Sequence, residues 1–231
     1  MSMLPIGGFQ KLSLVDFPET ICSIVFTQGC IFRCAYCHNP DLIPFSPSKI
    51  DEQEVFDYVM QNKKILEGVC ITGGEPTIHL GLHLFIEKIK ELGLKVKLDT
   101  NGIRPAVIGR LLEHNLLDYI AMDIKSPWEK YETIVRSFKN DSLNVCQETL
   151  HLIQDSGVNH EFRTTIMPGV HTPEDFLTIV GYLRNGEKYY IQETQYKKTL
   201  DQIMHQDLSF SVPDTIARIQ EQFPYVVVAH R

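Results

Sequence analysis

Three cysteines occupy positions 30, 34 and 37 of the chain, at the spacing C-x3-C-x2-C. They follow an apolar run, Ile21 to Phe26, which is typical of a buried strand. We therefore expect the thiolates of Cys30, Cys34 and Cys37 to lie on a loop that leaves the end of a strand. Soft thiolate ligands select iron–sulfur clusters, zinc or copper(I). Three of them suit a cubane cluster with one iron left open, because a structural zinc site normally has four protein ligands.

Two other interpretations of these cysteines compete with the cluster. A zinc ion could take His38 as its fourth ligand, but Cys37 and His38 are adjacent and would strain to reach one ion together. A disulfide framework is disfavoured, because the chain is long and shows no signal-peptide pattern. Cys22, Cys70 and Cys146 stand alone in apolar or helical surroundings, and we predict that they are small buried hydrophobic residues.

Further polar groups follow the ends of other apolar runs. They are Glu75 in the string Gly73-Gly74-Glu75-Pro76, Asp99 before Thr100-Asn101, Asp123 with Lys125, and Arg163. The two glycines allow close backbone approach, and a carboxylate attracts an ammonium group, although a plain β-turn would use the same residues. A solvated strand end or a helix cap remains the alternative for the aspartates. In barrels of parallel strands, functional residues gather at the carboxyl ends of the strands.

The elements that must position these groups alternate between strand and helix patterns. Strands are expected at 21–27, 68–72, 95–99, 119–124, 159–166, 189–191 and 225–229. Helices are expected at 52–64, 80–92, 105–114, within 127–157 with a break near Asn140-Asp141, from 172 onward, and at 214–222. Residues 1–20 form a lead-in with hairpin character, and 201–210 have no predicted element. Short βα spacings predict a parallel sheet, in one domain that spans residues 1–231.

Composition limits the function classes. The 231 residues carry 22 basic and 29 acidic side chains, a net charge of −7, which argues against a nucleic-acid-binding surface. No apolar run approaches the roughly 18 residues of a membrane span. We therefore expect a cytoplasmic protein in a reducing compartment.

The cysteine motif, with Tyr36 before the third cysteine, resembles the signature of the radical S-adenosylmethionine (SAM) family. The longer string T-Q-G-C-x-F-R-C-x-Y-C-H-N-P at 27–40 is similar to the activating enzymes of glycyl radical enzymes. Within that group the chain most resembles the activating proteins of anaerobic ribonucleoside-triphosphate reductases, which residues 8–11 and 13–18 also match. The resemblance implies an α/β fold, an incomplete (β/α)6 TIM-like barrel with a mostly parallel sheet, and a [4Fe–4S] cluster on the three cysteines.

The resemblance also implies a reaction. SAM is cleaved reductively to a 5′-deoxyadenosyl radical, which takes a hydrogen atom from a backbone glycine of a partner glycyl radical enzyme. The expected partner is an anaerobic ribonucleotide reductase, and the expected electron donor is a low-potential protein such as flavodoxin or ferredoxin. Two alternatives stay open: a radical SAM enzyme that acts on a small molecule or peptide, for example a deazapurine synthase, and a carrier of an iron–sulfur cluster or zinc.

Residues of the SAM site follow from the same resemblance. Gly73, Gly74, Glu75 and Pro76 resemble the G-G-E-P motif that takes the SAM amino group. The positions of Asp99, Thr100, Asn101, Asp123 and Lys125 match those around the SAM carboxylate, where two aspartates help to bind a monovalent cation.

The remaining assignments concern single side chains. Arg163 could fork onto the SAM carboxylate, Tyr36 could pack on the adenine, and His38 could hydrogen-bond SAM or sulfur. His79 and His83 are one helical turn apart, and we expect them on a solvated helix face without a metal.

Overall fold

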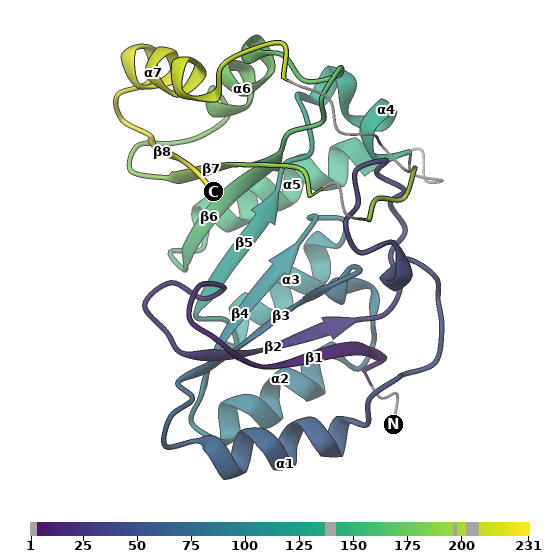
Figure 1. Cartoon of the computed structure of the whole chain (residues 1–231). Coiled ribbons are helices and arrows are strands. Elements are labelled where there is room, and N and C mark those ends of the chain that lie inside the picture. Colours follow the sequence, from purple (N-terminus) through teal and green to yellow (C-terminus); the bar gives the residue numbers. More distant parts are fainter. Residues whose placement is uncertain (1–3, 137–141, 196–197, 202–207) are drawn as a thin grey trace.

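The computed structural model describes residues 4–136, 142–195, 198–201 and 208–231 of the chain. These residues build one eight-stranded sheet in which the strands follow one another in chain order (Figure 1). The strands are β1 (Ile6–Ser13), β2 (Cys22–Thr27), β3 (Gly68–Gly73), β4 (Lys95–Thr100), β5 (Tyr119–Asp123), β6 (Asn159–Thr165), β7 (Lys188–Gln192) and β8 (Val227–His230). Strand β1 is antiparallel to β2, and all other pairs are parallel. The described part of the lead-in 1–20 therefore contributes one strand that pairs with β2, and it does not form a hairpin of its own.

Six of the parallel strands are each followed by a helix. The helices are α1 (Glu52–Asn62), α2 (Leu82–Glu91), α3 (Pro105–Glu113), α4 (Tyr131–Val135), α5 (Ser142–Asp155), α6 (Pro173–Val180) and α7 (Val212–Gln222). Strand β8 adds a seventh parallel strand beside β7. Among the described residues the edge strands β1 and β8 do not pair, so the sheet is open. The predicted α/β fold with six βα units and a mostly parallel sheet is therefore confirmed.

Local sequence sets the starts of several helices. The Asp51 carboxylate accepts a 2.9 Å hydrogen bond from the Gln53 amide at the start of α1. Before α6, the Asp175 carboxylate accepts from the Thr172 amide at 2.9 Å. Proline stands in the first turn of α3, α6 and α7, where its missing N–H would have no helical partner. These signals explain why the helix boundaries predicted from sequence lie within about two residues of the observed ones.

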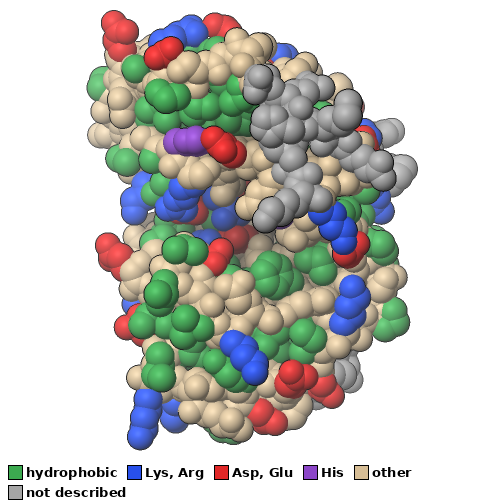
Figure 2. Space-filling view, in the orientation of Figure 1, with side chains coloured by type: hydrophobic (Ala, Val, Ile, Leu, Met, Phe, Trp, Pro, Cys, Tyr) green, Lys and Arg blue, Asp and Glu red, His purple; other side chains and the backbone are tan. Residues whose placement is uncertain are grey.

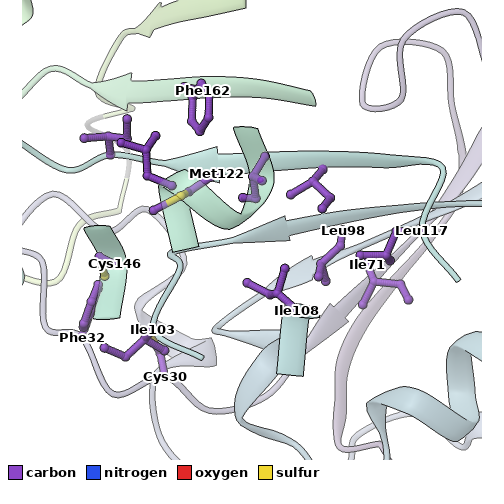
Figure 3. Close-up of a cluster of buried hydrophobic side chains, with 14 of the residues drawn as sticks. Cys30, Phe32, Ile71, Leu98, Ile103, Ile108, Leu117, Met122, Cys146 and Phe162 are labelled. Atoms are coloured by element: carbon purple, nitrogen blue, oxygen red, sulfur yellow. The ribbon is translucent and has the colours of Figure 1, made fainter. Parts of the chain in front are cut away.

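The two faces of the sheet differ because side chains alternate along each strand. One face packs on the helices in the larger hydrophobic core, part of which Figure 3 shows with Ile71 of β3, Leu98 of β4 and Cys146 of α5. The other face holds a small cluster of Phe17, Cys22, Ile24, Cys70 and Tyr119. Cys22, Cys70 and Cys146 are all buried in these cores, as predicted. On this second face, polar side chains lie at the carboxyl ends of the strands, beyond the apolar cluster.

Two predicted segments differ or fall outside the description. The region 127–157 contains a 3-10 turn (Trp128–Lys130), the short helix α4 and then α5, and Arg136 ends α4 with a left-handed φ of 45°. The predicted break at Asn140-Asp141 and most of the predicted loop, residues 202–207, lie outside the described residues. In the described part of the chain, we find no helix with the length and apolarity that crossing a membrane requires.

Candidate active site

The cysteine loop leaves β2 and is held against the segment 41–44. Gly29, with φ of 103°, takes a backbone conformation that favours glycine. The amides of Gly29 and Cys30 donate to the carbonyls of Leu42 and Ile43 at 2.6 and 3.0 Å. The buried Gln28 side chain donates two further 2.8 Å hydrogen bonds to carbonyls of the same segment. The backbone that carries the first cysteine is therefore fixed before any metal binds.

The three cysteines of the motif line one cavity as free thiols. Cys30 and Cys34 are buried, and Cys37 is partly buried. Burial raises the pKa of Cys30 to about 12 and of Cys34 to about 11, and it raises the pKa of Cys37 as well. Without metal these thiols hold their protons, so iron binding must release them.

The arrangement favours a cluster over a single ion. Among the described residues, no group of three or more His, Cys, Asp or Glu side chains surrounds one metal-ion position. A four-iron cluster distributes its thiolates over several irons, whereas zinc gathers its ligands around one centre. The Asn101 side-chain amide lies 3.9 Å from the Cys30 sulfur, within reach of a weak hydrogen bond.

The Gly73-Gly74 turn packs directly on the start of the cysteine loop. The Gly74 amide donates to the Thr27 carbonyl at 2.9 Å, and the Glu75 amide donates to the Gly29 carbonyl at 2.8 Å. A Cβ added to Gly74 would stand 2.1 Å from the Gly29 oxygen, and one added to Gly73 would stand 2.3 Å from the Thr27 nitrogen. Both positions therefore require glycine, because no side-chain atom fits between the two backbones.

The Glu75 carboxylate is buried, with 1% of the residue exposed. One oxygen accepts from the Thr77 amide and hydroxyl and from the Thr100 hydroxyl, and the other accepts from the Asn101 amide. Burial raises the pKa of Glu75, although these hydrogen bonds act in the opposite direction. The sequence assigned this carboxylate to the SAM amino group, but four protein donors already occupy it. Through these bonds it holds the β4–α3 loop against the Gly73-Gly74 turn, and its contact with the SAM amino group stays a prediction.

One cavity of about 370 Å³ connects the predicted residues. All predicted site residues line it except Pro76, which starts the 3-10 turn Pro76–Ile78. In Figure 2, blue and red side chains gather where this face is hollowed between its upper and lower halves. The volume falls in the range of small-molecule sites. Several other groups that line the cavity had no role predicted from the sequence: Asp16, Thr165, Glu193, Gln195 and Arg231.

Two carboxylates and three cations form a network at the strand ends. Asp99 pairs with Lys97 at 2.6 Å and with Arg163 at 3.1 Å. Asp123 pairs with the same Arg163 at 2.8 Å and with Lys125 at 2.8 Å. Burial alone would raise the pKa of both aspartates, but the neighbouring cations lower it below the usual range. Both aspartates are therefore charged at neutral pH, and so are their three partners.

Lys97 was not recognised as a site residue from the sequence. It lies two residues before Asp99 on β4, so both side chains project from the same face of the sheet. Glu161 and Arg163 are spaced in the same way on β6, and Glu161 pairs with Arg231 at 3.2 Å. Alternation along each strand could have identified both residues, because the position two before a functional residue shares its face.

His171 fixes the backbone next to the network. It is buried, its Nδ1 accepts from the Met167 amide at 2.9 Å, and its Nε2 donates to the Lys125 carbonyl at 3.0 Å. Burial lowers the pKa of His171 to about 4, so the ring is neutral and the two hydrogen bonds define its tautomer. This role of His171 could not be predicted from the sequence, because His171 belongs to no motif and its partners are backbone groups.

Tyr36 and His38 complete the wall of the cavity. The Tyr36 hydroxyl is buried and finds no hydrogen-bond partner among the described residues. Buried polar groups usually have partners, so this hydroxyl is available to a polar ligand in the cavity. His38 is exposed at the edge of the cavity, and partial desolvation together with the nearby Lys125 charge lowers its pKa, which keeps its ring neutral at pH 7.

The prediction for His79 was wrong. His79 precedes α2 and does not lie on it, and its Nε2 is buried without a partner among the described residues. Its ring lies 3.5 Å from the position a Cβ would take on Gly29. His83 is on α2, half-buried, and contacts Glu87 at 3.1 Å. The two histidines therefore do not share a solvated helix face.

Comparison with known proteins defines the class. Residues 24–183 match the model of the radical SAM superfamily. A protein of Methanocaldococcus jannaschii named as a glycyl-radical enzyme activating enzyme is 30% identical over 200 residues, 85% of this chain and 82% of its own length. The pyruvate formate-lyase-activating enzyme of Clostridium pasteurianum is 29% identical over 199 residues, 81% of each chain. The chain belongs to the radical SAM superfamily, within the glycyl-radical enzyme activating enzymes.

Solved structures agree on the fold. SuiB of Streptococcus suis bound to S-adenosylmethionine matches with a TM-score of 0.66 at 13% identity, over 88% of this chain and 48% of that one. QueE from Escherichia coli matches with a TM-score of 0.53 at 14% identity, over 99% of this chain and 93% of the QueE chain. The chain thus spans about half the length of the SuiB structure.

The family uses a [4Fe–4S] cluster and SAM, and the cavity fits both. Three thiols from one loop supply the ligands of a cluster with one open iron. The unpartnered Tyr36 hydroxyl and the strand-end charges supply contacts for a polar ligand beside it. A monovalent cation does not fit in the same way, because each aspartate already pairs with two basic side chains.

Proposed function

We propose that this protein activates an anaerobic ribonucleoside-triphosphate reductase by generating a radical on one of its glycines. The sequence at 13–18 supports this partner, because it resembles that branch of activating enzymes. In the structure, residue 13 is the last of β1 and residues 14–18 follow the strand. Val15 is 82% exposed, Leu14 is 68% exposed, and Asp16 lines the cavity. Side chains in contact with solvent at the edge of the cavity are available to a protein substrate.

The proposed roles of the residues follow from their positions. Cys30, Cys34 and Cys37 hold the cluster. When bound, the cluster supplies one electron to the SAM sulfonium, which breaks the C5′–S bond and leaves a 5′-deoxyadenosyl radical that takes a hydrogen atom from the glycine. Lys125 and Arg163 bind the SAM carboxylate, because together with Lys97 they carry three positive charges against the two negative charges of Asp99 and Asp123.

The other groups orient SAM and shield it. The backbone of Gly73 and Gly74 meets its amino group, while Glu75 holds Thr100 and Asn101 in place. Tyr36 and His38 form the wall against the adenosine part. Enclosure by these side chains excludes water and stray hydrogen donors from the radical.

Residues 1–231 act as a single domain, with 1–20 as a lead-in and 27–40 as the cluster loop. Flavodoxin or ferredoxin supplies the electron. An oxygen-sensitive cluster suits a reducing cytoplasm.

The test uses the reconstituted protein, a reductant, SAM and a candidate glycyl radical enzyme without oxygen. We expect a glycine-centred doublet in the electron paramagnetic resonance spectrum of an anaerobic ribonucleotide reductase. The doublet should disappear when its target glycine is replaced by alanine, and also with the Cys34→Ala activase. A doublet on pyruvate formate-lyase alone would refute this partner. Repeated SAM cleavage driven by a small metabolite, with every candidate partner radical-free, would refute activation and favour a small-molecule enzyme.

A further inference from the structure

Every carboxylate oxygen of the aspartates at the ends of β4 and β5 already faces a cationic side chain. Asp99 Oδ1 lies 2.6 Å from Lys97 Nζ, and its Oδ2 lies 3.1 Å from Arg163 Nη1. Asp123 Oδ1 lies 2.8 Å from Arg163 Nε, and its Oδ2 lies 2.8 Å from Lys125 Nζ. All four carboxylate oxygens thus face a cationic N–H donor. An alkali cation binds through such oxygens, so it would compete with these donors and lie close to their positive charges.

The negative charges of the network itself are already balanced without a metal cation. Lys97, Lys125 and Arg163 carry three positive charges against two negative charges on the aspartates, an excess of one. The next pair outward, Glu161 with Arg231, adds one charge of each sign and leaves the excess unchanged. Asp16, Glu75 and Glu193 also line the cavity, so the excess is confined to these paired groups at the strand ends, where it attracts an anion such as the SAM carboxylate.

Lys97 cannot easily withdraw from this network. Only 2% of its side chain is exposed, compared with 13% for Asp99 and 12% for Arg163. Its ammonium group lies 6.0 Å from the centre of the Tyr119 ring and 4.0 Å from the Cys70 sulfur, and neither can replace a carboxylate. Separating a buried ion pair leaves an uncompensated charge, which is strongly destabilising.

We propose that Lys97, together with Arg163 and Lys125, takes the place of a monovalent metal cation in this protein, so that SAM binding requires no such ion. Lys97 neutralises Asp99 from within the sheet, Arg163 bridges Asp99 and Asp123, and Lys125 neutralises the outer oxygen of Asp123. The inference depends on SAM binding, which belongs to the family, and not on the identity of the protein partner.

The experiment measures SAM affinity of the reconstituted protein by equilibrium dialysis without oxygen. Binding is compared in potassium, sodium and tetramethylammonium chloride at equal ionic strength. We expect the dissociation constants of the parent protein to agree within about twofold. The Lys97→Met variant frees one Asp99 oxygen, so its binding should become at least fivefold tighter in potassium than in tetramethylammonium. Lys90→Met is the matched control, because Lys90 pairs with Asp118 at 2.7 Å outside the cavity and its loss should leave the parent pattern.

A tenfold or greater dependence of parent SAM binding on potassium or sodium would overturn the proposal. A folded Lys97→Met variant that stays insensitive to the salt would overturn the assignment to Lys97. If that variant does not fold, the melting temperature of the parent protein in the three salts tests the proposal. The proposal expects the same melting temperature in all three salts, and a rise specific to potassium or sodium contradicts it. Since no partner enzyme is present, these outcomes are separate from failure of the proposed activation reaction.

Discussion

Replacing Gly74 by alanine tests the contact between the Gly73-Gly74 turn and the cysteine loop. The added Cβ would lie 2.1 Å from the Gly29 oxygen, which is 3.4 − 2.1 = 1.3 Å short of ordinary contact. The Leu42 oxygen, at 2.9 Å, blocks another direction, and both atoms are backbone. Overpacking of this kind costs roughly 1–3 kcal/mol, and rigid neighbours favour the upper end. We expect Gly74→Ala to lower the free energy of unfolding by about 3 kcal/mol.

The matched control is Gly109→Ala. Gly109 lies inside α3, and the nearest atom to its added Cβ is 3.6 Å away, so alanine should stabilise the helix by about 1 kcal/mol. Urea unfolding of the cluster-free proteins gives both values, and iron content after reconstitution reports the loop. Gly74→Ala should also bind less iron, because the displaced Gly29 directly precedes Cys30. A Gly74→Ala protein as stable as the parent, with full iron content, would refute the packing that we describe.

Three further predictions concern residues that position the site. Glu75→Gln should lower the free energy of unfolding by roughly 1–3 kcal/mol, because one of the buried donors loses its acceptor; unchanged urea unfolding would contradict this. Asn101→Leu removes the donor 3.9 Å from the Cys30 sulfur and should make the cluster reduction potential more negative, as a redox titration would show; an unchanged potential argues against the hydrogen bond. The pKa of His171 falls from 6.5 to about 4 on folding, so its stabilising effect is complete above pH 6.5 and is lost as the pH falls toward 4. Between pH 6.5 and 4, the free energy of unfolding of the cluster-free parent should therefore fall by roughly 3 kcal/mol more than that of His171→Gln, from 2.5 pH units at about 1.36 kcal/mol each. Parallel pH profiles of the two proteins would contradict this.

Much of the fold could be predicted because local signals agree with one another. The apolar run before Cys30 became β2, and the polar residues expected at strand ends do meet in one cavity. Parallel strands with a fixed register bring their carboxyl ends to one edge, so residues far apart in sequence become neighbours.

What sequence could not show is which atoms satisfy each charge. Glu75 fits a ligand motif, but its carboxylate is occupied by Thr77, Thr100 and Asn101. Lys97 lies inside a strand and belongs to no recognisable motif. Its ion pair with Asp99 follows from the alternation of side chains along β4, which puts both on one face. His79 was misplaced because a short 3-10 turn precedes α2 and changes the direction of the chain there.

In the proposed reaction a hydrogen atom moves from a glycine of another protein to the 5′ carbon of SAM. Its most direct test uses a partner reductase made with α-deuterated glycine, incubated with the reduced activase and SAM without oxygen. We predict singly deuterated 5′-deoxyadenosine by mass spectrometry, in an amount equal to the glycyl radical formed. Unlabelled 5′-deoxyadenosine alongside a full glycyl radical signal would contradict direct transfer. No deuterium and no radical on any partner would contradict the assignment as an activating enzyme.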